Sequence, residues 1–187
     1  VTGPTSRSSK DQEARRPRTG AALDPDANST PKPSRPGQPA ETSQQPDLLE
    51  ADRLMQLGKI ERAQSNYGAA RKCYKDALKI FRSDGDRAGE GKVLAQFGNM
   101  YRVQGNLDQA IEHQTQALAI VRELGNKSEE GVLLDNIGNI LRVQGQSDQA
   151  IALYSQALTI ARELGHKRHE GSHLGNLGDA FFALERL

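Results

Sequence analysis

The sequence predicts an all-α protein, built as an α-solenoid of repeated helix-turn-helix units behind a disordered N-terminal arm. Three observations support this class. The chain repeats itself every 40 residues from Glu50 onward, apolar residues recur at helical spacing inside each repeat, and all prolines lie within residues 1–46. The repeats that begin at Glu90 and Glu130 are identical at 22 of 40 positions, which chance does not produce.

The first segment, residues 1–46, is predicted to be a disordered arm or linker. It is rich in Ser, Thr, Pro, Gly and charged residues, and it holds little that is apolar beyond Val1, Leu23 and scattered Ala. Such a composition cannot bury enough apolar surface to offset the loss of chain entropy on folding. The folded array is therefore expected at residues 47–187, with Asp47 as the N-cap of its first helix.

Each repeat is predicted to hold two helices joined by a tight turn. In the second repeat, Leu94 and Tyr101 share one face of the first helix, and a second apolar stripe runs through residues 107–124. Gly105 suits the left-handed conformation after a helix, and Asn106 suits the N-cap of the next one, with a capping-box partner three residues later. The repeats are expected at about 50–89, 90–129 and 130–169, followed by a partial repeat at 170–187.

One column of the repeat contains only glycine, at Gly58, Gly98, Gly138 and Gly178. A glycine inside a helix costs about 1 kcal/mol relative to alanine, so a column in which glycine recurs in every repeat indicates close packing. We expect the paired helix backbones to approach closely there, with Ala110 and its equivalents on the second helix.

Both ends of the array depart from the pattern. The first repeat has Glu61 where Tyr101 stands in the second, and Ser65 at the turn glycine, so it is predicted to be a cap or a weakened repeat. The partial fourth repeat stops before its second helix. An unpaired helix that carries Leu174 and Phe181 would expose apolar surface, so a longer array is expected.

The pattern resembles the tetratricopeptide repeat (TPR) over residues 47–187. The residues that match its consensus spacing are Leu94, Gly98, Tyr101, Ala110, Ala117, Leu134, Gly138, Ala150, Tyr154 and Ala157. The period of 40 exceeds the roughly 34 residues usual in the family. Together with the run Arg-Glu-Leu-Gly at 122–125 and 162–165, it is similar to the longer subclass in Pins-type polarity adaptors and many bacterial TPR regulators. The resemblance implies a right-handed superhelix whose concave groove binds a partner.

The resemblance also implies which residues line that groove, on the first helix of each repeat. They are Lys59, Arg62, Lys92, Asn99, Arg102, Asp135, Asn139, Arg142, Asp179 and Phe182. Aligned Arg side chains would grip carboxylates, and aligned Asn side chains would bind the backbone of an extended segment. The alternative is that these are solvated helix-face residues, repeated because the unit was duplicated.

The family's carboxylate clamp for chaperone tails is not predicted, because Met55, Ala95 and Asp135 stand where that clamp needs Lys. The expected function is a protein-protein interaction scaffold or adaptor for a protein or peptide partner with acidic residues. That partner either has mixed charge or is an amphipathic acidic segment. The alternative function is a ligand-sensing or autoinhibitory arm of a larger signalling protein.

The segment from His169 to His173 matches the zincin pattern, with Glu170 between the two imidazoles. However, Glu90 and Glu130 fill the same column without a neighbouring His, so the repeat itself explains Glu170. The chain carries no phosphate-binding loop and no nucleophile motif. We therefore expect no catalytic residue, metal or cofactor, and no enzymatic activity.

The overall charge is nearly balanced, with 25 Lys and Arg against 24 Asp and Glu, which argues against a nucleic-acid partner. No apolar run reaches the length of a membrane span, so no membrane partner is expected, and no small-molecule substrate is expected either. The only cysteine, Cys73, gives no sign of an oxidising compartment. These features favour a cytoplasmic location, although the chain begins with Val1 rather than Met.

Overall fold

The computed structural model of this chain describes residues 44–185, and the predicted disordered arm lies outside them apart from its last three residues. The described part consists of helices and contains no strand. The helices are α1 (Gln44–Ala63), α2 (Tyr67–Asp84), α3 (Arg87–Val103), α4 (Leu107–Glu123), α5 (Lys127–Val143), α6 (Ser147–Glu163) and α7 (Lys167–Leu184). Because α1 is described from Gln44, Asp47 lies in its first turn, and its predicted role as N-cap is wrong.

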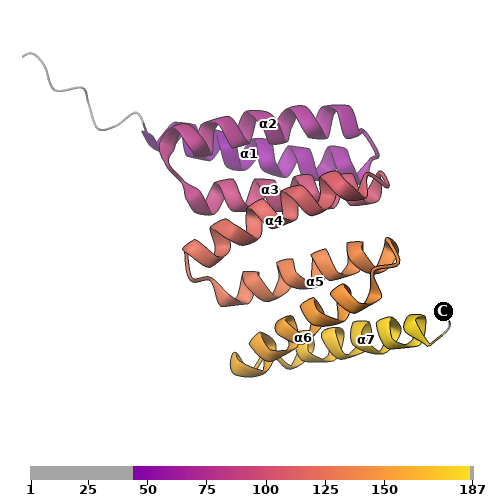
Figure 1. Cartoon of the computed structure of the whole chain (residues 1–187). Coiled ribbons are helices and arrows are strands. Elements are labelled where there is room, and N and C mark those ends of the chain that lie inside the picture. The colour runs from indigo at the N-terminus through magenta and orange to yellow at the C-terminus, as the bar shows by residue number, and fades with distance from the viewer. Residues whose placement is uncertain (1–43, 186–187) are drawn as a thin grey trace, which may run out of the picture. The chain divides into compact units, whose positions relative to one another are not determined.

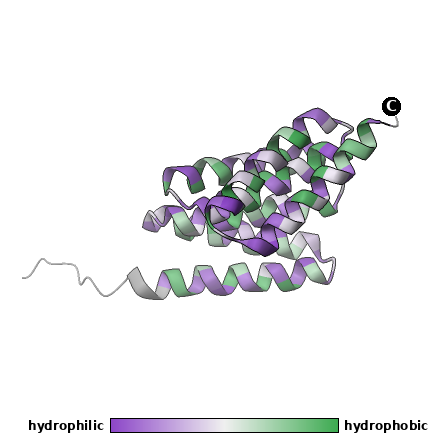
Figure 2. Ribbon diagram, turned by 90° about the horizontal axis from the view of Figure 1, so that it is seen from below, coloured by the Kyte–Doolittle hydropathy of each residue, from purple (hydrophilic) through white to green (hydrophobic). Residues whose placement is uncertain are grey.

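Consecutive helices pack on one another in chain order, and the closest packing joins α1 with α2, α3 with α4, and α5 with α6 (Figure 1). Each of these pairs is one sequence repeat, and α7 packs on α6 as the first helix of the next. Hydrophobic and hydrophilic residues alternate along the helices, as expected when each helix buries one face (Figure 2). The predicted all-α solenoid of helix-turn-helix repeats is confirmed.

The turns follow the glycine pattern that the sequence predicted. Gly105 has a φ of 78° and Gly125 a φ of 68°, both in the left-handed region that glycine tolerates. Ser65 takes the same conformation, with a φ of 64°, although its side chain makes this cost about 1–2 kcal/mol. Even so, α1 and α2 pack on each other as closely as the later pairs. In agreement with a weakened first repeat, α1 buries fewer residues than α3 or α5.

The N-caps of the helices agree with the sequence-based predictions more often in position than in their side-chain hydrogen bonds. Asn106 is the N-cap of α4, but its side chain makes no capping hydrogen bond, so the predicted capping box is wrong. At the start of α5, by contrast, the Asn126 side chain accepts a 3.2 Å hydrogen bond from the backbone N–H of Glu129.

Within the described residues, no helix is long and apolar enough to cross a membrane.

The glycine column has a different partner from the one expected. A Cβ at Gly58 would lie 2.5 Å from the Tyr74 ring, and one at Gly138 would lie 2.7 Å from the Tyr154 ring. These are side chains of the second helix, so glycine makes room for a large buried side chain rather than for a neighbouring backbone. At Gly178, on α7, a Cβ would meet no atom within 4 Å, because this part of α7 has no second helix against it among the described residues.

Candidate functional site: the charged face of the first helices

Three arginines occupy the same place in successive repeats, namely the last turns of α1, α3 and α5. They are Arg62, Arg102 and Arg142. The Arg102 side chain is exposed, whereas Arg62 and Arg142 are half-buried. The repeat therefore carries the same cation to the same point of each first helix.

The two half-buried arginines lie beside the buried tyrosines of the second helices. Burial raises the pKa of the Tyr154 phenol, and the neighbouring Arg142 opposes that shift; Tyr74 and Arg62 repeat this arrangement. The Nε atoms of both arginines are enclosed and have no hydrogen-bond partner in the described structure. Packing against tyrosine therefore holds these guanidinium groups in place.

A second set of arginines lies at the ends of the second helices, and each of them pairs with a glutamate. The Nε of Arg82 lies 2.7 Å from Glu90, that of Arg122 lies 2.8 Å from Glu130, and that of Arg162 lies 3.0 Å from Glu170. Each pair spans the turn between one repeat and the next. The glutamate column is therefore structural, as the sequence indicated for Glu170. Its arginine partners were missed, although they also recur every 40 residues.

The bonding of Glu130 shows how firmly this column is held. Its side chain is only 8% exposed and lies 2.7 Å from the Lys127 ammonium as well as close to Arg122. The hydrogen bond from Lys127, followed by the one from Arg122, lowers the pKa of this carboxyl against the opposing effect of burial. Two cations thus neutralise one buried carboxylate at the turn.

The cations of the candidate face have no such carboxylate. None of the ion pairs within the described residues involves Lys59, Arg62, Lys92, Arg102 or Arg142. Lys92 and Arg102 are exposed, and Lys59 is half-buried. The cations of this face therefore form no ion pair with an acidic residue of the described array.

The two aligned asparagines are both engaged inside the protein. Asn99 accepts a 3.0 Å hydrogen bond from the buried Gln114 amide, and Asn139 accepts one of 3.1 Å from the Tyr154 hydroxyl. Asn139 also donates to the side chain of Asp135, at 3.0 Å. The predicted asparagines thus meet the second helices of their own repeats.

Asp135 is the centre of a polar network that links α5 to α7. One of its carboxylate oxygens lies 2.8 Å from Nδ1 of His173 and accepts a 2.7 Å hydrogen bond from Asn176. The His173 side chain is buried, being only 4% exposed. The sequence suggested a zincin motif for His173 and missed this contact, although the two residues are 38 positions apart, nearly one repeat.

The remaining two predicted residues, Asp179 and Phe182, are exposed on α7. Within the described residues, no group of three or more His, Cys, Asp and Glu side chains is arranged to hold a metal ion. The acidic member of the zincin pattern is held by Arg162 and Lys167, both 3.0 Å from Glu170.

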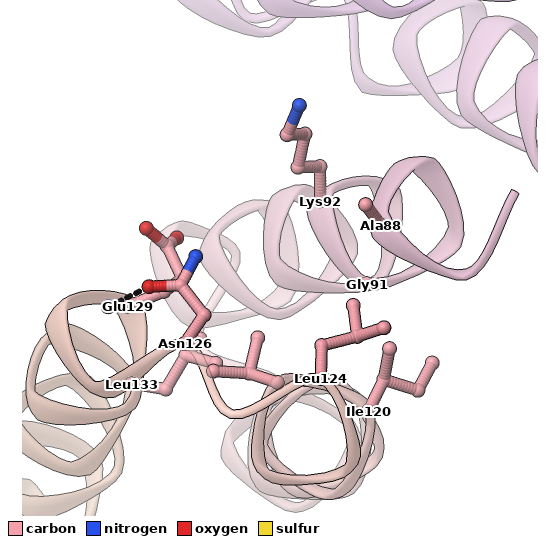
Figure 3. Close-up of a pocket in the computed structure, with 9 residues that line it drawn as sticks. Ala88, Gly91, Lys92, Ile120, Leu124, Asn126, Glu129 and Leu133 are labelled. Carbon is pink, nitrogen blue, oxygen red and sulfur yellow. Dashed lines mark hydrogen bonds between the residues drawn. The ribbon is translucent and has the colours of Figure 1, made fainter.

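A small pocket opens beside Lys92, where α3, α4 and α5 meet (Figure 3). Its volume is about 60 Å³. The lining residues are Ala88, Gly91, Lys92, Ile120, Val121, Leu124, Asn126, Glu129 and Leu133. The wall is mostly aliphatic, and the charged groups of Lys92 and Glu129 point away from it (Figure 3).

The model of the tetratricopeptide repeat matches residues 49–124 and 129–187, which together make up most of the chain. The chain belongs to the tetratricopeptide repeat family. Members of this family mediate protein-protein interactions. None of the curated protein sequences compared with this chain matches it significantly.

Solved structures of other proteins share this fold. A signal transduction ATPase with numerous domains (STAND) protein with a tetratricopeptide repeat sensor, from Pyrococcus horikoshii, is 21% identical with a TM-score of 0.69, over 74% of this chain and 22% of that one. Aspartyl phosphate phosphatase F from Bacillus subtilis is 14% identical with a TM-score of 0.65, over 75% and 39%. The N-terminal domain of stress-induced protein-1 from C. elegans is 12% identical with a TM-score of 0.58, over 72% and 96%.

Proposed function

We propose that this TPR array is an interaction scaffold that binds an extended, acidic segment of a partner protein along the first helices. Arg102 and Arg142 pair with the partner's carboxylates, with Arg62 and Lys59 extending the same face toward α1. Asn99 and Asn139 orient the side chains that surround these arginines. Arginine suits this role because its fork of N–H donors holds a carboxylate through two hydrogen bonds.

The observation that carries the proposal is the contrast between the two sets of arginines. The arginines at the ends of the second helices pair with Glu90, Glu130 and Glu170. Those of the first helices meet no carboxylate in the described array, although the repeat places them as regularly. Arg62 and Arg142 are half-buried and packed against tyrosine, so little side-chain entropy is lost when they bind an anion. Arg102 is exposed and equally unpaired, so it supplies an accessible charge for the same partner.

The test uses peptides selected from a displayed library for binding to the full chain. Replacing Arg102 and Arg142 together by Glu puts repulsion where the partner's carboxylates would lie. The expected loss is at least about a hundredfold in affinity, measured by isothermal titration calorimetry, since two charge pairs become two like-charge contacts. Circular dichroism checks that helicity is unchanged.

The matched control replaces Lys75 and Lys79 by Glu, because both are exposed on α2 and the net charge changes equally. This control should bind the peptides as the unaltered chain does. Since Arg142 is half-buried, the single variant Arg102→Glu guards against misfolding and should still weaken binding about tenfold. Equal affinity of Arg102→Glu and the unaltered chain would contradict the proposal.

The sensing or autoinhibitory arm stays the second candidate. It is favoured by the fold shared with a STAND protein that has a tetratricopeptide repeat sensor, of which this chain spans 22%. An interaction in cis distinguishes it from the scaffold. If a domain of the parent protein competes with the selected peptides for the unaltered chain but not for Arg102→Glu, the array is an autoinhibitory arm.

A further inference from the structure

We propose that the pocket between α3, α4 and α5 receives one aliphatic side chain of the bound partner segment, next to an acidic residue that pairs with Lys92. This inference rests on the proposed function, and it adds to that function a second recognition element. The partner motif it predicts is a Leu, Ile, Val or Met beside an Asp or Glu.

The pocket has the size and lining for such a side chain. Its volume of about 60 Å³ is several times the roughly 10–15 Å³ that one water requires on the same scale. The walls are formed by Ile120, Val121, Leu124 and Leu133. Water inside would have few polar partners, so its displacement by an apolar group is favourable.

Small residues on α3 keep the pocket open. Gly91 has no side chain, and a Cβ there would already lie 3.2 Å from Ile120. One turn earlier, Ala88 reaches the rim with only a methyl group (Figure 3). Gly91 therefore lets α3 lie close to Ile120, and one turn earlier no side chain larger than that of Ala88 fills the space beside the pocket.

The equivalent positions of the neighbouring repeats have different chemistry. One repeat earlier, the position of Val121 is occupied by Phe81, whose ring packs against Gly89. One repeat later, histidines replace the three pocket residues of α5 and its cap; they are His166, His169 and His173. A pocket of this aliphatic composition therefore belongs to the junction of α3, α4 and α5, and it defines one register for a bound segment.

The charges at the rim identify the neighbouring residue of the partner. Lys92 is exposed, makes no ion pair within the described structure, and lies on the same helix as Arg102. Glu129 on the opposite rim disfavours a second acidic residue on that side. A segment with its aliphatic side chain in the pocket and one carboxylate toward α3 complements both walls.

The test fills the pocket without adding or removing charge. Ala88→Leu does this, and the first repeat already carries Leu48 at the equivalent position, so the helix accepts the residue. Ala152→Leu, at an exposed site on α6, is the matched control. Random dodecapeptides displayed on phage are selected against the unaltered chain, Ala88→Leu, Ala152→Leu and Arg102→Glu.

The unaltered chain and Ala152→Leu should enrich peptides with an aliphatic residue beside an acidic one. These peptides should bind Ala88→Leu about tenfold more weakly, the effect of expelling one buried aliphatic group. Acidic peptides without an aliphatic preference, equally bound by Ala88→Leu, would overturn the pocket and leave the arginine proposal standing. Aliphatic peptides that depend on Ala88 but not on Arg102 would support the pocket and overturn the arginine proposal. Failure to enrich any peptide would overturn both.

Discussion

At the residue scale, His113 on α4 shows how the surroundings of one side chain set its charge. Its ring stacks on Phe97 with centroids 5.1 Å apart and on Tyr101 at 5.3 Å. Its Nδ1 is enclosed without a hydrogen-bond partner in the described structure. Burial lowers the pKa of His113, with only a smaller opposing effect from Glu112, so the neutral ring is favoured.

This arrangement predicts a loss of stability in mild acid. Because the folded-state pKa of His113 is lowered, the unfolded chain binds more protons below the ordinary value near 6.5. The contribution of the neutral His113 ring to stability is therefore fully present above that pH, and it is lost as the pH drops through the folded-state pKa. Between pH 7.5 and 5.5 the unfolding free energy should fall more in the unaltered protein than in His113→Phe, which has no titrating ring at this position. Urea denaturation of both proteins at both pH values measures this, and parallel pH profiles would contradict it.

At the scale of the element, each helix pair depends on one glycine of the first helix and one large side chain of the second. Gly138 lies against Tyr154, and Gly98 lies against the buried Gln114, where a Cβ would approach within 2.6 Å. The same column on α7, Gly178, faces open space. The repeat therefore contains a natural comparison between a packed and an unpacked glycine.

Alanine should have opposite effects at these two positions. At Gly138 the added methyl clashes with the Tyr154 ring, and the expected loss of stability is about 1–3 kcal/mol. At Gly178 it meets no atom within 4 Å, so the better helix propensity of alanine should stabilise the protein by up to about 1 kcal/mol. Urea denaturation followed by circular dichroism measures both changes. A shift in the same direction for the two variants would show that the clash does not control packing.

At the scale of the whole molecule, the distribution of charge matters more than its sum. The formal net charge is only +1, so the chain as a whole exerts little attraction on an anion. The turns between repeats hold ion pairs such as that of Arg122 with Glu130. Arg102 and Lys92, in contrast, pair with no carboxylate within the described array. Attraction for an acidic segment is therefore local to one face.

Binding of the selected acidic peptides should consequently weaken with salt. Between about 50 and about 500 mM NaCl, the screening length falls below the spacing of neighbouring helices, and affinity should drop about tenfold. The variant Lys75→Glu, Lys79→Glu should show the same salt dependence, because those lysines lie on α2 away from the face. If that variant lost the salt dependence, the net charge rather than the face would explain the attraction.

The sequence by itself determined the fold of this protein. The period of 40, the apolar stripes and the turn glycines at Gly105 and Gly125 are local signals repeated along the chain, and each local choice agrees with the others. The column of glutamates is also recognisable in the sequence, and it indicates that Glu170 belongs to the repeat rather than to a zinc site.

The tertiary structure decided which polar residues are free and where space is left. Asn139 and Asp135 looked equivalent to the groove arginines, yet they bond to Tyr154 and His173, while Arg102 stays exposed. The pocket beside Lys92 has walls from three helices. Hydrogen bonding and unfilled volume depend on distances between side chains that lie far apart in the sequence. The sequence pattern of one repeat does not predict those distances.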